Sequence, residues 1–392
     1  MYISCSAEQK IFEIPSTGEG IIAGYWSSEQ DLCSQPVRLQ WKDGKISSLE
    51  PLSHLEDYPE KALRWDSYFL MPGFSDAHVH LALDSLDFYQ CLENWAQPLL
   101  IEDKVKRFLQ RYLEMGIVAV RDGGDLPGFS WKAKNRVNEG VWSGPAVVSV
   151  HEAVNRAGMY GRFLGRGFKD LLEWREKESD FFRQGLDQLK VIVTGLIRFD
   201  YFQRVGPTQW TVEELSELVK SAHERGILVM AHASGEEGIS AAIAAGVDSV
   251  EHGYYIRTKQ LELMKEKNIA WVPTVAPIGN ILKYPSDRYS SQEIDTLKRI
   301  LESQLSKIRE AYGLHVRLGI GTDAGAYRVP HAESLYDEFE WMVQAGIPRR
   351  EVYGMATHEN ARILGRPELG RLEIGTPMNL LQLVKNLGKG LA

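Results

Sequence analysis

The sequence is poor in cysteine. Its 392 residues include only Cys5, Cys33 and Cys91, and no CxxC pair. So few thiols exclude a zinc site built from cysteine, and they are typical of free thiols in a reducing compartment. The N-terminus also lacks the basic start and the apolar run of a signal peptide. We therefore predict a cytoplasmic protein.

Long apolar runs and basic blocks are missing as well. No uninterrupted apolar stretch approaches the roughly 20 residues of a membrane span. The 45 basic and 53 acidic residues leave a formal charge of −8, which argues against a nucleic-acid or anionic-membrane partner. A hydrophobic content of 44% with 25% charged residues is typical of a globular chain. We expect a small-molecule substrate as partner, and a homo-oligomer stays open.

The first 70 residues differ in pattern from the long central part of the chain. Short segments of β character, 21–26 and 37–41, are separated by turn-forming residues. Asp43-Gly44, between Trp41 and Ile46, predicts a hairpin turn. After Gly365 the segments 371–374 and 380–384 have strand character again. We therefore predict a small β domain from residues 1–70 plus 366–392.

Between these ends, apolar runs alternate with amphipathic stretches, as in chains that form a parallel sheet. The runs are a strand ending at His80 and 118–120, 146–150, 191–193, 227–230, 248–250, 270–275 and 318–320. Helices are predicted over 211–224, where Thr211 and Glu214 form a capping box, and over 290–312 and 334–345. Eight such units over residues 71–365 predict an α/β fold of the (β/α)8 or TIM barrel type. A doubly wound sheet is the alternative.

Residues that typically bind metals stand at the ends of predicted strands. His78 and His80 are two apart in a strand and therefore face the same side. His232, His252 and Asp323 end three later runs, at the strand ends where barrel enzymes place their active sites. Imidazole and carboxylate are the ligands expected for zinc or a similar metal. The pattern therefore predicts a metal centre.

Lys190 is unusual because it lies in the apolar strand segment 189–193. A strand inside a barrel is buried on both faces, and lysine is rarely buried without compensation of its charge. Two interpretations are open. Its side chain reaches solvent from the strand start, or CO2 converts it to a carbamate, an anionic ligand able to bridge two cations.

This constellation resembles the binuclear metal-dependent members of the amidohydrolase superfamily, in its dipeptidase- and imidazolonepropionase-like branch. The resemblance covers nearly the whole chain and includes the stretches 72–78, 321–325 and 356–362. It implies a β-sandwich built from both termini beside the barrel. It also implies a set of metal ligands, with the lysine carboxylated: His78, His80, Lys190, His232, His252 and Asp323.

The resemblance further implies a function. Two divalent ions, expected to be zinc, and a CO2-derived carbamate on Lys190 would hold a bridging hydroxide that attacks a carbonyl. Asp323 would be the catalytic residue that moves the proton to the leaving nitrogen. The reaction would be hydrolysis of an amide, a peptide-like bond or a cyclic amide. Two alternatives stay open: a mononuclear deaminase or ring hydrolase, which lacks the strand-4 lysine, and a non-catalytic homologue acting as a binding protein.

Candidates for substrate binding lie on loops after predicted strands 3, 4 and 8. These side chains could bind a substrate carboxylate, or they could simply be solvated. They are Tyr160, Arg162, Arg198 and Arg328. Tyr160 stands where relatives often place a substrate-facing histidine, and Ser234 where dipeptidase-like relatives tend to carry tyrosine. His331 and Glu333 are candidate partners that orient the metal ligands.

Overall fold

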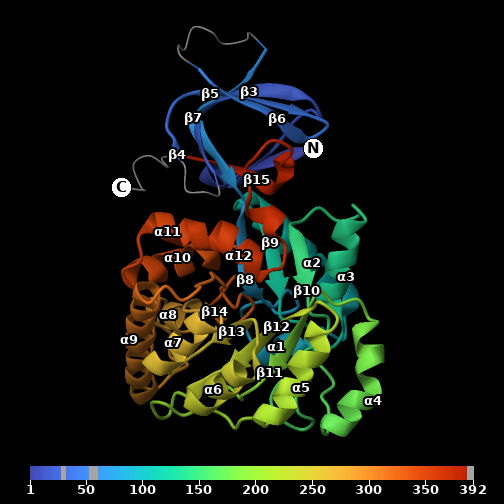
Figure 1. Ribbon diagram of the computed structural model, residues 1–392, viewed down its shortest axis with the longest axis vertical. Coiled ribbons are helices and arrows are strands. Elements are labelled where there is room, and N and C mark those ends of the chain that lie inside the picture. Colours follow the sequence, from blue (N-terminus) through green and yellow to red (C-terminus); the bar gives the residue numbers. More distant parts are fainter. Residues whose placement is uncertain (28–31, 53–60, 386–392) are drawn as a thin grey trace.

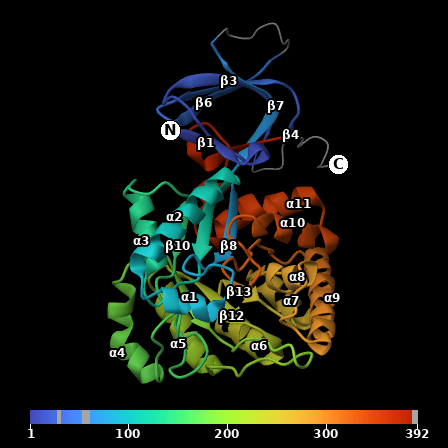
Figure 2. The same cartoon turned by 180° about the vertical axis from the view of Figure 1, so that it is seen from behind.

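The structure is a computed structural model that describes residues 1–27, 32–52 and 61–385. A sheet built from both ends of the chain forms one end of the molecule, and parallel strands flanked by helices form the rest (Figure 1). Seen from behind, the N-terminal strands again lie together at that end (Figure 2). The observed fold is therefore mixed α/β with a separate terminal sheet.

The terminal sheet has the order β2-β1-β15-β7-β3-β5-β6, with β4 paired to β3. β15 is parallel to β1 and antiparallel to β7, so the C-terminal segment completes a sheet that the N-terminal segment begins. This confirms the predicted strand at 380–384. The strands are β1 (Tyr2–Cys5), β2 (Lys10–Glu13), β3 (Gly18–Trp26), β4 (Leu32–Cys33), β5 (Val37–Lys42), β6 (Lys45–Pro51), β7 (Leu63–Pro72) and β15 (Leu381–Val384).

The predicted hairpin at Asp43-Gly44 is confirmed. Lys42 pairs with Lys45 across the turn, and both turn residues have positive φ, 50° and 76°, as a tight hairpin requires. The predicted strand at 371–374 is wrong. That segment instead leads into a turn at Gly375, whose N–H donates to the carbonyl of Ile46 at 2.8 Å. Gly375 has a φ of 94°, a value that breaks an extended strand.

Seven parallel strands carry the rest of the fold. They form two sheets, β10-β9-β8 and β11-β12-β13-β14. A bridge from Val154 to Val191 connects the chain after β10 with β11. The strands are β8 (Phe74–Val79), β9 (Ile117–Asp122), β10 (Ala146–Ser149), β11 (Gln188–Ile192), β12 (Leu228–Ala233), β13 (Ser249–His252) and β14 (Ala270–Val272).

The bounds of most predicted strands shift by a few residues in the structure, and the last two predicted strands need a separate account. The seventh ends at Val272 rather than at Val275, because Pro273 comes next and has no N–H for the ladder. The predicted eighth strand, 318–320, makes only a single bridge, from Leu318 to Trp271. The chain there nevertheless lies between β14 and β8, since Ala77 donates its N–H to the carbonyl of Ile320 at 2.9 Å.

The three helices predicted from the sequence are all present. α5 begins at the predicted capping box of Thr211 and Glu214, and α9 begins at a second box. The helices are α1 (Phe88–Asn94), α2 (Pro98–Glu114), α3 (Phe129–Asn138), α4 (Leu171–Phe182), α5 (Val212–His223), α6 (Gly235–Ala245), α7 (Thr258–Glu266), α8 (Ala276–Lys283), α9 (Ser291–Gly313), α10 (Ser334–Gln344), α11 (Arg349–Gly354) and α12 (Asn360–Ile363). Single turns are η1 (Ser6–Glu8), η3 (Met355–Glu359), η4 (Pro367–Gly370) and η5 (Met378–Leu380).

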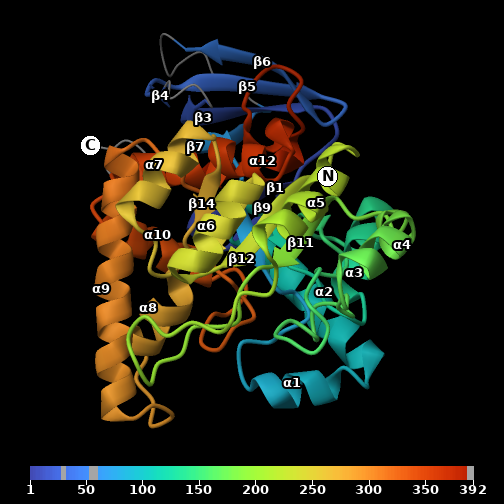
Figure 3. The ribbon, with the colours of Figure 1, turned by 60° about the horizontal axis from the view of Figure 1, so that its bottom comes forward.

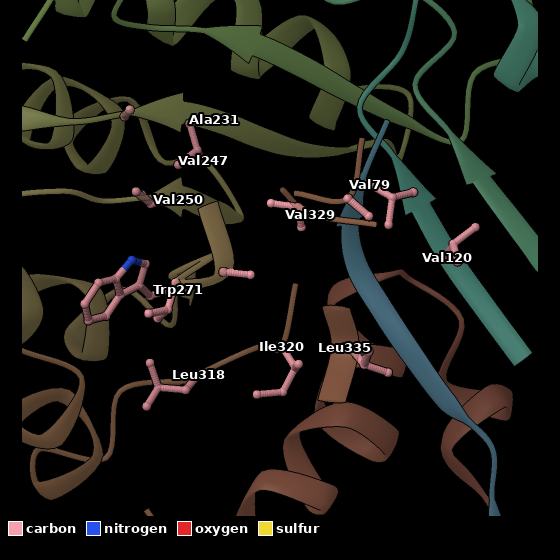
Figure 4. Packing of buried hydrophobic residues seen from close by; sticks show 14 of the residues in the cluster. Val79, Val120, Ala231, Val247, Val250, Trp271, Leu318, Ile320, Val329 and Leu335 are labelled. Carbon is pink, nitrogen blue, oxygen red and sulfur yellow. The ribbon is translucent and has the colours of Figure 1, made fainter. Parts of the chain in front are cut away.

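The main core lies between the parallel strands and the helices (Figure 4). Trp271 of β14 is fully buried there, and its indole N–H donates to the carbonyl of His252 at 3.0 Å. A Cβ on Gly253 would lie 2.5 Å from the same indole nitrogen. Core packing therefore fixes the end of β13, where His252 lies. None of the helices in the described ranges has the combined length and apolarity of a membrane span.

We predict that Trp271→Ala lowers the free energy of unfolding by about 3–5 kcal/mol, because it opens a cavity and removes this hydrogen bond. Urea unfolding measures the change. Leu99→Ala is the control, since Leu99 is 81% exposed and its loss should cost less than about 0.5 kcal/mol. Equal losses in the two variants would contradict the role given to Trp271.

Candidate metal centre and substrate cavity

The structure brings the six predicted metal ligands together at the carboxyl ends of the parallel strands. The Nε2 atoms of His78 and His80 lie 3.6 and 3.5 Å from Asp323 Oδ1. The imidazole of His252 lies between two others, with ring centroids 4.9 Å from His78 and 4.5 Å from His232. Potential ligand atoms of His78, His80 and Asp323 lie within 4.8 Å of one another, so these three could hold one divalent ion.

Lys190 points into the same cluster. Its side chain is 1% exposed, which excludes the interpretation that it reaches solvent. Its Nζ lies 3.2 Å from His78 Nε2 and 3.4 Å from His80 Nε2. No carboxylate within the described residues pairs with it at ion-pair distance. A Cβ on Gly123 would lie 2.5 Å from both Nζ and His80 Cε1, so a larger residue at this position would displace the lysine or the imidazole.

Burial sets the protonation of the cluster. It lowers the pKa of His232 to about 3 and holds the pKa values of His78, His80 and His252 well below their usual range. Nearby Lys190 acts in the same direction. These imidazoles are therefore neutral at physiological pH, the form that binds metals. Burial also lowers the pKa of Lys190 and raises that of Asp323.

The free ring nitrogens fit a metal. His252 uses Nδ1 in a 2.7 Å hydrogen bond with Thr274 Oγ1, which leaves its Nε2 for another partner. His232 Nε2 is buried and has no hydrogen-bond partner among the described residues. Such an atom is costly to bury unless a ligand satisfies it. The donor set, neutral imidazoles with one carboxylate, suits zinc or a similar divalent ion.

Two residues that the sequence analysis missed hold His78 in place. Glu251 Oε2 lies 2.7 Å from His78 Nδ1, and its Oε1 accepts from Arg121 Nη2 at 2.8 Å. Arg121 also donates to the carbonyl of Ala77 at 2.6 Å. All of these side chains are buried. This carboxylate–histidine contact fixes which ring nitrogen faces the cluster. The signal available in the sequence was a charged residue directly after each of the predicted apolar runs 118–120 and 248–250.

The backbone near the cluster is unusual at two of the ligands. His252 and Asp323 have φ values of 66° and 58°, in the left-handed region that costs energy for non-glycine residues. Asp76 fixes the segment before Asp323, because its carboxylate accepts from the N–H and the hydroxyl of Thr322 at 3.0 and 2.6 Å. The surrounding hydrogen bonds therefore hold Asp323 in a strained position that faces His78.

A cavity of about 290 Å³ opens beside the cluster. Its walls come from the loop between β11 and α5, from α8 and from the chain around Tyr327. The loop between β11 and α5 and helix α8 lie beside each other (Figure 3). Of the four residues predicted to bind substrate, Tyr160 lines the cavity, and its ring lies 5.5 Å from that of His232. The cavity lining does not include Arg162, Arg198 or Arg328.

His331 and Glu333 do not orient the cluster, so that prediction is wrong. The ring nitrogens of His331 form hydrogen bonds with the hydroxyl of Tyr112 and the carbonyl of Leu83, both at 2.9 Å. Glu333 pairs with Arg111 at 2.6 Å. The chain still lines the cavity at Ala326 and Tyr327, and only the residues after them reach these other partners, which sequence spacing alone does not reveal.

Similar proteins share this architecture. The model of the amidohydrolase family matches residues 69–386. Ochratoxinase of Aspergillus niger is 26% identical over 364 residues, with 84% of this chain and 74% of the relative covered. Among solved structures, a Xaa-Pro dipeptidase with bound methionine in its active site has a TM-score of 0.78 at 22% identity and covers 94% of both chains. A putative prolidase from Bifidobacterium longum has a TM-score of 0.75 at 23% identity and covers 93% of this chain and 88% of its own.

We predict that Glu251→Gln weakens metal binding by about 10- to 100-fold, because His78 loses the carboxylate that orients its ring. Competition with a chromogenic chelator measures the affinity. Glu338→Gln is the matched control. Glu338 is equally buried but accepts from the N–H groups of Val275 and Ala276 at the start of α8. Wild-type metal affinity in Glu251→Gln would contradict the assignment.

Proposed function

This chain belongs to the amidohydrolase family and is a hydrolase of carbon–nitrogen bonds, and we propose that it works through a binuclear metal centre. The ligands would be His78, His80, a carboxylated Lys190, His232, His252 and Asp323. Two divalent ions, zinc by the chemistry of the donors, would occupy it. The substrate would be an amide, a peptide-like bond or a cyclic amide.

The observation that carries this proposal is the burial of Lys190 among imidazoles. A buried ammonium without a carboxylate partner is costly, and burial lowers the pKa of Lys190. The neutral amine is the form that can attack CO2, forming an N–C bond and releasing a proton. The resulting carbamate would place an anionic oxygen where Nζ now contacts His78 and His80.

Bound divalent ions would supply Lewis acidity and water of lowered pKa. The chain's own groups would do the rest. Asp323 would accept the proton of the attacking water and then donate it to the leaving nitrogen. Burial raises the pKa of its carboxyl, which suits a group that must hold a proton between the two steps. Glu251 would keep His78 oriented throughout.

We also infer the finer architecture. The seven strands and segment 318–324 would close into a (β/α)8 barrel, which is supported by the hydrogen bonds of His80 with Ala324 and of Asp323 with His78. Residues 1–70 and 366–392 would form the β-sandwich-like domain, and 71–365 the barrel. Residues 28–31, 53–60 and 386–392 of the first domain lie outside the described residues. A cytoplasmic location, a small-molecule partner and a homo-oligomer remain predictions.

We predict that Asp323→Asn lowers kcat by about 10²- to 10⁴-fold, because the amide cannot take up the proton. Most of the bound metal should stay, since five other ligands remain. Asp248→Asn is the control, because Asp248 accepts from the N–H of Val229 at 2.7 Å and lies directly before β13, away from the cluster. Retention of more than about a tenth of wild-type kcat in Asp323→Asn would disprove the proton role.

Lys190→Ala should lose one metal ion per chain together with activity, because no bridging anion remains. Short carboxylates such as formate should restore part of the activity by replacing the carbamate. The loss of metal should also lower the melting temperature, since ligands that bind only the native state stabilise it. Lys104→Ala, which removes a lysine paired with Asp84, is the control.

If Lys190→Ala kept its full metal content and activity, the mononuclear deaminase or ring hydrolase would replace the binuclear proposal. If the wild-type protein bound no metal and hydrolysed no amide, the remaining alternative would be a non-catalytic binding protein.

A further inference from the structure

The cavity beside the cluster has walls that are mostly aromatic and aliphatic. The ring of Tyr289 packs edge-on against Phe199 at 5.8 Å and against Tyr327 at 6.4 Å. Nearer the cluster, Tyr254 stacks on His252 with centroids 6.0 Å apart and planes 5° from parallel. Ile278 and Ile281 of α8 add aliphatic surface. Such walls bind apolar groups and aromatic rings.

Cationic side chains are scarce in this lining. Among the described residues that line the cavity, Lys190 is the only lysine or arginine and Asp323 the only acidic residue. Both belong to the cluster itself. Arg198 is exposed and pairs with Asp200 at 3.4 Å. Arg288 and Arg328 stack against the ring of Tyr327, at 4.3 and 5.4 Å from its centroid, and neither lines the cavity.

We propose that the cavity selects uncharged amides that carry an aromatic or branched apolar group, over dipeptides and N-acyl amino acids with a free carboxylate. This inference rests on the proposed function and names the substrate class for it. A carboxylate held among the rings of Phe199, Tyr289 and Tyr327 would find no lysine or arginine among the described residues that line this part of the cavity. Burial of an unpaired carboxylate costs several kcal/mol, whereas an apolar group gains from the same surroundings.

The test uses two amides that differ at a single group, N-benzoyl-L-phenylalanine and N-benzoyl-L-phenylalaninol. In the alcohol, CH2OH replaces the carboxylate. Release of benzoate by the metal-loaded protein gives kcat/KM for each compound. We expect the uncharged alcohol to be preferred by at least about tenfold, which corresponds to ~1.4 kcal/mol. Equal use of the two compounds, or preference for the carboxylate, would overturn the proposal.

A gain-of-charge variant tests the physical cause. Leu196 lines the cavity and is 52% exposed, so Leu196→Arg should fold and place a cation at the rim. We expect the preference for the alcohol to fall by at least about fivefold in this variant, ~1 kcal/mol of selectivity. Leu86→Arg is the matched control, since Leu86 is 71% exposed and is not part of the lining. An unchanged preference in Leu196→Arg would contradict the proposed cause.

Arg328→Met examines the competing idea that a loop arginine binds a substrate carboxylate. The proposal expects no change in use of the carboxylate compound, and a selective rise in its KM would overturn the proposal.

A binding measurement separates failure of this inference from failure of the proposed function. Calorimetry on metal-loaded Asp323→Asn protein, whose turnover should be at least about 10²-fold slower, gives Kd for both compounds. Tighter binding of the alcohol would support the selectivity even if the wild-type protein hydrolysed neither compound, in which case only the proposed function would fail. Tighter or equal binding of the carboxylate would overturn the selectivity even if the wild-type protein hydrolysed other amides.

Discussion

A buried primary amine that forms no ion pair with a carboxylate of the described residues is the constraint on which the rest of this site depends. Lys190 is held against two imidazole nitrogens, in surroundings that penalise its charge. A lone ammonium would repel any cation that entered. A carbamate would remove that repulsion and supply the anionic ligand that the surrounding neutral histidines lack. Gly123 leaves room for this arrangement, since a Cβ there would lie 2.5 Å from both Lys190 Nζ and His80 Cε1.

The positions of the predicted metal ligands depend on hydrogen bonds that they and their neighbours form with surrounding strands. Glu251 and Arg121 connect β13, β9 and the end of β8 around His78. Asp76 connects β8 to the segment that carries Asp323, and Trp271 fixes the carbonyl of His252. These three ligands are therefore positioned by groups on neighbouring strands. This arrangement lets His252 and Asp323 keep left-handed backbone conformations, a strain that the surrounding contacts must offset.

Much of the fold and of the cluster could be predicted from the sequence. The spacing of apolar residues indicates which segments are buried, and the carboxyl ends of parallel strands lie at one edge of the sheet. The spacing of His78 and His80 and the ends of three later apolar runs predicted five members of the cluster. The place of Lys190 among them was implied by the resemblance to the amidohydrolase superfamily. Long-range partners were not predictable in this way. Glu251 and Arg121 are 130 residues apart, and no local pattern pairs them. The positions of loop residues were the hardest to predict. His331 lies soon after Asp323 in the chain, yet its side chain forms a hydrogen bond with the carbonyl of Leu83. The direction of a loop depends on its contacts rather than on sequence spacing.

Anomalous diffraction at the zinc edge, from crystals of wild-type protein loaded with zinc in bicarbonate, tests the central claim most directly. The account predicts two peaks among the six side chains, with additional density on Lys190 Nζ that reaches both. One peak or none, with an unmodified Lys190 side chain, would contradict the binuclear centre.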